Sequence, residues 1–361
     1  MFYFLFPLKD ISMVFNLFRY ITFRSAAASV TAFIICLWIG PHMIRWLRAL
    51  KATTFNQREY AEKIHSFYAH KNQVPTMGGL LIVASVVISA ILWGNLTNRF
   101  VWILLFILLW FGGVGFLDDW IKMKSKSSRG LTSLTKLIGQ LAMGIFFGLY
   151  LYLDPSFDKW FYWPFFKNAT IYLGVFFVPF VILVLVGASN ALNLTDGLDG
   201  LAIGCTLFAT ASFGLIAYLV GRVDFSAYLN IPHVPEAGEV TVICAALVGA
   251  SAGFLWYNSY PAEVMMGDTG SLSLGGILGA IAVLTKKEAV LVIVGGIFVF
   301  EAVSVILQVA SFKFLRKRIF LMAPFHHHLQ LKGWPESKVT IRFWIIALIL
   351  AVIGLSTLKV R

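Results

Sequence analysis

Long apolar stretches separated by short polar segments recur along almost the whole chain of 361 residues. Each approaches the ~20 residues that an α-helix needs to cross a bilayer. The predicted spans are 25–44, 76–94, 98–117, 132–152, 170–188, 201–220, 240–257, 270–285, 289–311 and 340–358. Because a helix satisfies its own backbone hydrogen bonds in lipid, the pattern predicts an all-α polytopic membrane protein with about ten transmembrane helices.

Composition supports this reading. The chain is 59% hydrophobic and 13% charged, whereas soluble domains are about 25% charged. It shows neither an internal repeat nor a separate soluble domain, so residues 1–361 are predicted to form a single integral membrane domain. Residues 1–24 lack a small-residue cleavage site and are predicted to form a retained interfacial helix.

The distribution of Lys and Arg predicts the orientation in the membrane. With ten spans, the loops rich in basic residues fall on one side; they are 45–74, 118–136 and 313–338. The positive-inside rule makes this side cytoplasmic and both termini periplasmic. The net charge of +12 fits this topology, with contacts to membrane lipids and, in part, to anionic substrates. Because the basic residues are spread over several loops, nucleic acid is not an expected partner.

Acidic residues gather at the cytoplasmic ends of the predicted spans. Asp118 and Asp119, in "GGVGFLDDW", close the third span, where the helix dipole disfavours each carboxylate by roughly 0.3–1 kcal/mol. Asp268, in "MGDTGS", begins the eighth span, where it could also be a simple N-cap. Because a carboxylate at the end of a helix is unfavourable by itself, the position of Asp118 and Asp119 favours a bound cation over a purely structural role for this pair.

The segment "NALNLTDGLDG" carries carboxylates and carboxamides but neither Lys nor Arg. One helical turn would align Asn190, Asn193 and Asp196, and Asx turns capping the next helix at Asp199 are the alternative reading. Together with the other acidic residues they predict a Mg²⁺ ion, a hard cation held by few carboxylates and completed by substrate phosphates.

Two basic segments lie on the same side. Lys71 and Thr76 bracket Pro75 before the second span, which suits a phosphate-facing turn, with membrane anchoring as the alternative for Lys71. The run His326–His328 points in several directions, which argues against one zinc site and favours phosphate contacts. Glu301 and Gln308 lie inside the ninth span, and their roles as functional groups or as interhelical partners stay open.

Several motifs resemble one known family. "FLDDW", "NALNLTDGLDG" and "MGDTGS" occur in this order and are similar to the polyprenyl-phosphate sugar-1-phosphate transferases over nearly the whole chain. "KNQVPTMGG" and "APFHHHLQLKGWPESKVTIRFW" resemble its phospho-N-acetylmuramoyl-pentapeptide transferase branch, which the triple His separates from the N-acetylglucosamine-phosphate branch. No P-loop, dinucleotide-binding or HExxH motif competes with this resemblance.

The resemblance implies an activity and its partners. The chain is expected to transfer phospho-N-acetylmuramoyl-pentapeptide from UDP-N-acetylmuramoyl-pentapeptide to undecaprenyl phosphate, giving lipid I and UMP for peptidoglycan synthesis. It also implies Mg²⁺, a homodimer, and a place in the bacterial cytoplasmic (inner) membrane with the active site facing the cytoplasm. One-step transfer and a covalent phosphosugar intermediate both remain open, although phosphate is already a good nucleophile.

Residue roles follow from the same resemblance. Met265 stands where the family usually has Phe, three residues before the metal ligand, and its thioether can still pack on a uracil ring. Asp268 is expected to hold the metal ion. The expected catalytic residues are Asp118, Asp119, Asp268, His326 and His327; the expected substrate contacts are Lys71, Thr76, Asn190, Asn193, Asp196, Asp199, Asn258, Met265 and His328.

Three alternatives remain. A transferase acting on another UDP-N-acetylhexosamine and a polyprenyl phosphate is the nearest. An ion-coupled transporter would place its carboxylates near the bilayer midplane on broken helices, whereas these cluster at one end of the spans. An intramembrane aspartyl protease would need only two facing Asp residues, and neither the His run nor the basic loops would be explained.

Overall fold

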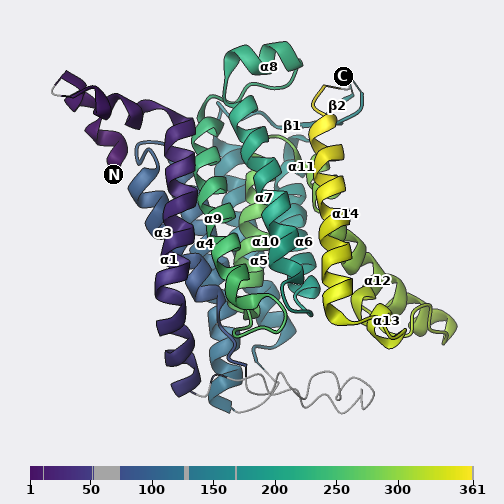
Figure 1. Cartoon of the computed structure of the whole chain (residues 1–361). Coiled ribbons are helices and arrows are strands. Elements are labelled where there is room, and N and C mark those ends of the chain that lie inside the picture. Colours follow the sequence, from purple (N-terminus) through teal and green to yellow (C-terminus); the bar gives the residue numbers. More distant parts are fainter. Residues whose placement is uncertain (11, 51, 53–73, 126–129, 167–168, 360–361) are drawn as a thin grey trace.

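The computed structural model describes the whole chain except residues 11, 51, 53–73, 126–129, 167–168 and 360–361. Its long helices run roughly along one axis and form a single bundle (Figure 1). They are α1 (Ile21–Ala49), α3 (Gly79–Trp93), α4 (Arg99–Ser125), α5 (Ser133–Leu153), α6 (Phe177–Thr195), α7 (Leu201–Val220), α9 (Val240–Asn258), α10 (Gly267–Leu284), α12 (Gly296–Leu315) and α14 (Glu336–Ser356).

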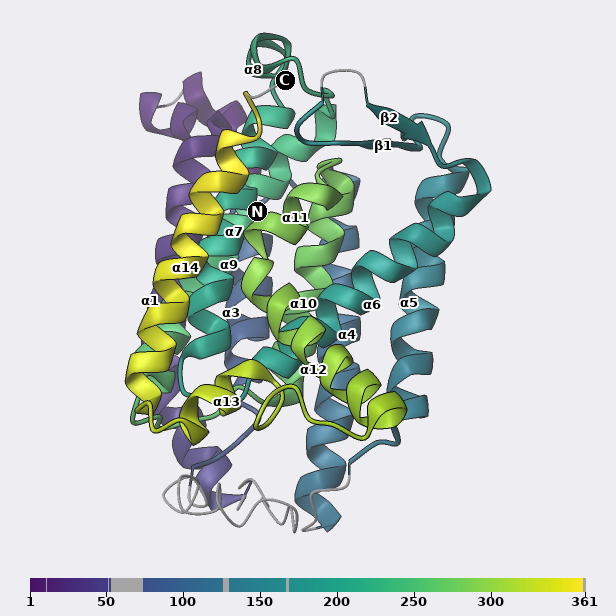
Figure 2. The same ribbon diagram turned by 90° about the vertical axis from the view of Figure 1, so that its right-hand side faces the viewer.

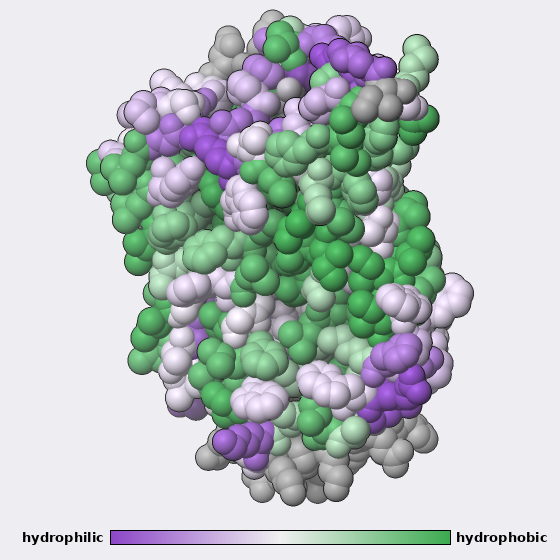
Figure 3. All heavy atoms as spheres, turned by 90° about the vertical axis from the view of Figure 1, so that its left-hand side faces the viewer, coloured by the Kyte–Doolittle hydropathy of each residue, from purple (hydrophilic) through white to green (hydrophobic). Residues whose placement is uncertain are grey.

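Nine helices in the described part of the chain are long and apolar enough to cross a membrane, and the shorter α3 is a tenth apolar helix. A wide band of hydrophobic side chains surrounds the middle of the molecule, with hydrophilic side chains gathered toward its two ends (Figure 3). The prediction of an all-α polytopic membrane protein with about ten spans is therefore confirmed. Which side each end faces stays a prediction.

Helix α10 is the centre of the bundle. Every residue from 269 to 284 is buried, and the helix packs against α3, α4, α6 and α7. Small residues make this close packing feasible: a Cβ on Gly115 of α4 would lie 2.2 Å from the backbone oxygen of Asp268. The glycines before the acidic pair thus let α4 approach the beginning of α10 closely.

The predicted span 289–311 is wrong as a single helix. The structure breaks it into α11 (Glu288–Val294) and α12, with Gly295 and Gly296 at the junction. Two successive glycines weaken helix continuity because they carry the largest backbone entropy cost. Beyond the break, α12 leans away from the bundle axis and passes close to α13 (Phe325–Leu331) near the end that holds the acidic residues (Figure 2).

Two further predictions need correction. Residues 1–24 do not form one helix: two 3-10 helices, η1 (Phe2–Asp10) and η2 (Met13–Arg19), precede α1, and Pro7 inside η1 removes a backbone donor. Its interfacial location stays a prediction. The predicted span from 170 begins later, because β2 (Thr170–Tyr172) pairs antiparallel with β1 (Trp160–Tyr162) before η4 (Gly174–Phe176) leads into α6.

The remaining short elements lie between spans. They are α8 (Val223–Leu229) and η5 (Pro235–Glu239). The β-hairpin and α8 cap one end of the bundle, near the C-terminus, whereas α13 and the last turns of α4 lie at the other (Figure 1). The basic segments predicted to share one side therefore share one end, as far as they are described.

Candidate active site

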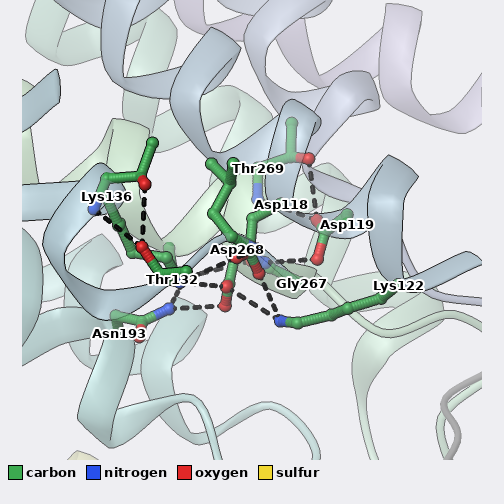
Figure 4. Close-up of polar contacts among 12 residues, drawn as sticks. Asp118, Asp119, Lys122, Thr132, Lys136, Asn193, Gly267, Asp268 and Thr269 are labelled. Atoms are coloured by element: carbon green, nitrogen blue, oxygen red, sulfur yellow. Dashed lines mark hydrogen bonds and ion pairs between the residues drawn. The ribbon is translucent and has the colours of Figure 1, made fainter. Parts of the chain in front are cut away.

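Three carboxylates meet at one end of the bundle. Asp118 and Asp119 lie in the last part of α4, and Asp268 is the second residue of α10. One oxygen from each lies within 4.8 Å of the others, and Figure 4 shows the three side chains pointing toward one another. Asp118 and Asp119 are almost fully buried, at 1% and 2% exposure. The predicted convergence of the acidic motifs is thus observed for these three residues.

Two lysines enter the same cluster. Lys122, one turn after Asp118, places its Nζ 2.5 Å from Asp118 Oδ2 and 3.0 Å from Asp268 Oδ2. Lys136, from α5, lies 2.6 Å from Asp268 Oδ2 and 3.5 Å from Asp118 Oδ1. Their side chains are 34% and 19% exposed. Positive charge therefore reaches the carboxylates from two helices while keeping contact with solvent.

Asp119 is bound to the beginning of α10. Its Oδ1 accepts a hydrogen bond from the Asp268 backbone N–H, and its Oδ2 accepts from the backbone N–H and the hydroxyl of Thr269. Gly267 makes room for this contact: its φ is +72°, and a Cβ there would lie 2.7 Å from Asp119 Oδ2. A carboxylate that accepts hydrogen bonds from the start of a helix helps to hold that helix in place. The predicted catalytic role of Asp119 stays a prediction.

Asn193 and Thr76 complete the cluster. The Asn193 carboxamide donates to Asp268 Oδ1 at 2.8 Å and to the Ser271 hydroxyl at 2.7 Å. The Thr76 hydroxyl lies close enough to Gly267 to meet a Cβ at 2.8 Å. Asp268 is thus held by lysines on one oxygen and by Asn193 on the other, which fixes its orientation.

Two other predicted contacts are turned toward the protein. Asn190 donates to the backbone oxygen of Val186 and pairs with Gln140 of α5. Asn258 accepts from the backbone N–H of Gly200 and donates to the backbone oxygen of Val264. These carboxamides stabilise the loops around the site, and their predicted contacts with substrate stay predictions.

Asp199 is also engaged with the backbone, since its Oδ2 accepts from the Ala262 N–H at 3.1 Å. Met265 is half-buried, and its backbone pairs with Pro75 and Gly78. That pairing joins the segment before α3 to the segment before α10, and so brings Thr76 to the cluster. Asp196 is half-buried just past α6, and Lys71 lies outside the described residues.

The three histidines occupy the short helix α13. His326 is fully buried, with its Nδ1 3.3 Å from Glu301 Oε2, and its backbone N–H donates to Glu301 Oε1. His327 contacts Gln330 through Nδ1 at 2.9 Å. His328 accepts from a backbone N–H, and partial burial with nearby Lys332 lowers its pKa. The run therefore presents three different environments, as the consecutive positions predicted.

The ring of His326 also reaches the polar loop after α6. A Cβ on Gly197 would lie 2.2 Å from His326 Nε2. The role of Glu301 was open from the sequence. In the structure its carboxylate contacts both the backbone N–H and the ring of His326. Gln308, the other open residue, holds the backbone near residues 319 and 320.

Sequence reasoning missed Lys122 and Lys136 as site residues, counting them only toward the basic loops. The spacing of Lys122 four residues after Asp118 was a usable signal, because such pairs share one helix face. Lys136 gave no local signal, since only the packing of α5 beside α4 brings it to Asp268. Both residues belong to the site as the structure shows it.

The donor set suits a hard divalent cation. Three carboxylates face two ammonium groups, so one negative charge is left over. Asp118 Oδ2 is paired with the Lys122 ammonium, and the Asp118 carboxylate also lies against that of Asp268. Carboxylate oxygens favour a hard cation over softer metals.

Comparison with known proteins identifies related transferases. Residues 101–286 match the model of glycosyl transferase family 4. Phospho-N-acetylmuramoyl-pentapeptide-transferases from Pelobacter propionicus and Citrifermentans bemidjiense are each 50% identical over 361 residues, covering all of both chains. The transferase of that name from Solidesulfovibrio magneticus is 51% identical, covering this chain fully and 99% of its own.

The matched region and the full-length relatives confirm the family resemblance that the motifs indicated. The matched region contains Asp118, Asp119 and Asp268, and the relatives align from end to end. The segments with Thr76 and the histidines, outside the family match, are covered by the full-length relatives. The chain belongs to glycosyl transferase family 4 and, within it, to the phospho-N-acetylmuramoyl-pentapeptide-transferases.

Proposed function

We propose that the chain transfers phospho-N-acetylmuramoyl-pentapeptide from its UDP-activated form to undecaprenyl phosphate, producing lipid I and UMP for peptidoglycan synthesis. The observation that carries this proposal is the meeting of Asp118 and Asp268 with Lys122 and Lys136 at one end of a membrane-spanning bundle. A membrane-bound acceptor and a soluble, strongly anionic donor both have access to such a position. The full-length relatives bear the name of this activity.

The reaction joins two anions, and charge is its main obstacle. A lipid phosphate oxygen attacks the β-phosphorus of the UDP-sugar, and the bond from that phosphorus to the bridging oxygen breaks. UMP leaves with the bridging oxygen, and the new P–O–P linkage joins sugar and lipid. Mg²⁺ held by Asp268 would neutralise the diphosphate during this exchange. The identity of the ion is part of the proposal.

The two lysines have a second role toward the substrate. Both ammonium groups contact Asp268 and remain partly exposed, so phosphate oxygens of a bound diphosphate come within their reach. Fixed positive charge beside a departing phosphate lowers the barrier because it stabilises charge that develops in the transition state. Lys122 and Lys136 are accordingly assigned to the donor diphosphate.

Asp118 is the best placed carboxylate for proton transfer. Its Oδ2 contacts the partly exposed ammonium of Lys122, a partner that a substrate can replace, whereas both oxygens of Asp119 accept hydrogen bonds from the start of α10. In our preferred mechanism Asp118 accepts the proton of the lipid phosphate, which then attacks directly. Attack by an Asp itself, with a covalent phosphosugar intermediate, is the alternative.

His326 is held for its role by Glu301. The contact of Glu301 with both the backbone N–H and the ring fixes α13 against α12, and Nε2 then faces the loop at Gly197. We assign Glu301 as a positioning residue and His326 and His327 to the phosphate side of the site. Both act from α13, which lies beside the segment linking α6 to α7.

The remaining assignments follow the family. Asn193 contacts Asp268 directly and Thr76 lies beside Gly267 at the edge of the cluster, and both are proposed to meet the donor. Lys71, Asn190, Asp196, Asp199, Asn258, Met265 and His328 keep their predicted substrate roles as proposals. The cytoplasmic orientation of the site, the inner membrane location and a homodimer are proposed as well.

The test uses purified protein in lipid nanodiscs with radiolabelled donors. Undecaprenyl phosphate and Mg²⁺ are supplied with either UDP-N-acetylmuramoyl-pentapeptide or UDP-N-acetylglucosamine, and lipid product is separated from donor. Product from the first donor alone is expected. Product from UDP-N-acetylglucosamine alone would instead favour the nearest alternative, another sugar-phosphate transferase, and product from neither would contradict the proposal.

A further inference from the structure

The segment between α5 and α6 exposes an unusual number of aromatic side chains at the end of the bundle opposite the acidic cluster. We call residues 157–166 and 169–176 the aromatic hairpin; β1 and β2 form its core. Large aromatic side chains are 42–76% exposed on it, namely Trp160, Trp163, Phe165, Phe166, Tyr172 and Phe176. In water, such a patch would be unfavourable and marks a surface that contacts something else.

The described charged groups of the hairpin, Asp158 and Lys159, are half-buried and paired within the protein. The Asp158 carboxylate accepts from the Trp160 backbone N–H and from the Tyr162 hydroxyl. Lys159 donates to the backbone oxygen of Asp154 at 2.6 Å, and Asp154 itself forms an ion pair with Arg99 at the start of α4. These contacts leave the described outer surface of the hairpin dominated by rings.

The hairpin is fixed to the bundle rather than loosely attached. Phe157 is 4% exposed, and its ring lies 6.1 Å from that of Phe177. Lys286, at the end of α10, donates to the Asp158 backbone oxygen and lies 4.1 Å from the centre of the Phe157 ring. Phe161 contacts Phe180 of α6 edge-on at 5.4 Å. The exposed rings therefore stand on a rigid base, and their exposure is a property of the folded molecule.

The exposed rings continue the lipid-facing surface of the neighbouring spans. Leu149 and Leu153 on α5 and Leu183 on α6 are 43%, 73% and 69% exposed, and the hairpin extends from the ends of these two helices (Figure 2). Along the helices the exposed residues include aliphatic ones, whereas Trp and Tyr appear at the hairpin. This change matches the passage from the hydrocarbon core to the headgroup region, where amphipathic rings are enriched.

We propose that the aromatic hairpin is a lipid anchor, with its exposed rings lying among the headgroups and upper acyl chains of the leaflet opposite the acidic cluster. The occupant of this surface is phospholipid. Through Lys286, the anchor is attached to the far end of the helix that begins beside Asp268, so it fixes the depth of α10 in the bilayer.

An environment-sensitive fluorophore on a single cysteine tests the anchor. Phe166→Cys is suitable because Phe166 is 63% exposed, and native Cys36, Cys205 and Cys244 are buried and serve as an unlabelled background. Asp224→Cys on α8 is the matched control, since that side chain is 57% exposed at the same end. Each protein is placed at one copy per nanodisc of phosphatidylethanolamine and phosphatidylglycerol, with or without brominated acyl chains.

The expected result is strong quenching of the Phe166→Cys probe by brominated lipid and an iodide quenching constant several-fold below that of the control. Tyr172→Cys, on the other strand, is expected to behave alike and guards against one badly folded variant. Iodide quenching equal to the control, without quenching by lipid, would mean an aqueous loop. Protection from both quenchers at one copy per disc would mean that protein covers the patch, and would equally overturn the proposal.

Discussion

Helix α10 carries buried charge at both of its ends, and the two ends differ in what those charges can reach. At its beginning, Asp268 meets two lysines that are 34% and 19% exposed. Past its other end, Lys286 is 1% exposed and Glu288 is 4% exposed, with Phe rings over the Lys286 ammonium. The first cluster can exchange its internal partners for a substrate, whereas the second can only stabilise the fold.

The two ends of α10 also use a nearby lysine in different ways. Lys136 neutralises carboxylates that would otherwise repel each other and a donor diphosphate. Lys286 is held by a backbone oxygen and by rings, and burial lowers its pKa to about 8. Buried charge alone is therefore a poor indicator of function in this molecule, and excess carboxylate with partial solvent access is the better one.

Removal of the proposed base should have the largest effect among the following changes. Asp118→Asn is expected to lose about 10²–10⁴-fold of kcat at neutral pH. If Asp118 only accepts a proton, raising the pH should restore much of the rate, because the lipid phosphate is then fully ionised. Asp224→Asn, on exposed α8, is the control and should behave as the wild type. A pH-insensitive dead variant, together with UMP release by the wild type without lipid acceptor, would favour the covalent mechanism.

Loss of one ammonium group should cost somewhat less. Lys136→Met is expected to reduce kcat about 10²–10³-fold, the usual cost of removing one group that stabilises transition-state charge. Lys124→Met is the matched control, since Lys124 lies exposed in the last turn of α4. Steady-state rates at saturating donor measure both. Equal rates for the two variants would show that Lys136 balances charge in the resting protein without serving the reaction.

Glu301→Gln should cost roughly 10-fold to 100-fold in kcat, because small misplacements of catalytic groups carry costs up to that size. The carboxamide keeps an acceptor for the His326 backbone N–H but loses the charge beside the ring. Little change in KM for the donor is expected. Ser304→Ala, which leaves this carboxylate in place, is the control. Full activity of Glu301→Gln would reduce Glu301 to a packing residue.

The smallest effect is expected at the far end of α10. Burial raises the pKa of Glu288 from 4.5 to about 7, so the folded chain holds a proton that the unfolded chain has released between these values. Stability should therefore fall as pH rises from about 4.5 to about 7. Glu288→Gln should flatten this dependence of the apparent Tm while kcat stays unchanged. An identical pH dependence in both proteins would disprove the assignment.

Much of the fold was predictable because burial in lipid leaves few solutions for an apolar run. The junction at Gly295 and Gly296 was not, since a continuous apolar pattern gives no sign that two half-helices diverge. Residues 170–172 were predicted to begin a transmembrane span, because the aromatic and β-branched residues that favour strands are also apolar. Interfacial segments are where hydropathy is least informative.

The residues of the site likewise divide into those that sequence patterns predict and those that only the packing of helices brings together. Asp118, Asp119 and Asp268 were predictable because helix direction and motif position place them at one end of the bundle. Lys136 and the Glu301–His326 contact depend on how helices pack, which single-sequence patterns do not specify. Asn258 looks like a ligand-binding residue in sequence, yet its carboxamide joins two backbone segments. A polar side chain beside a site can equally serve the loops that form it.

The carboxylates at the beginning of α10 are proposed to hold a divalent cation, with Asp268 as its ligand. Electron paramagnetic resonance of Mn²⁺, a spectroscopic substitute for Mg²⁺, measures binding directly in nanodiscs with UMP present. Wild type and Asp224→Asn should bind Mn²⁺ in competition with Mg²⁺, and Asp268→Asn should bind it at least about tenfold more weakly, with loss of transfer activity. Wild-type affinity in the Asp268→Asn variant would contradict the account.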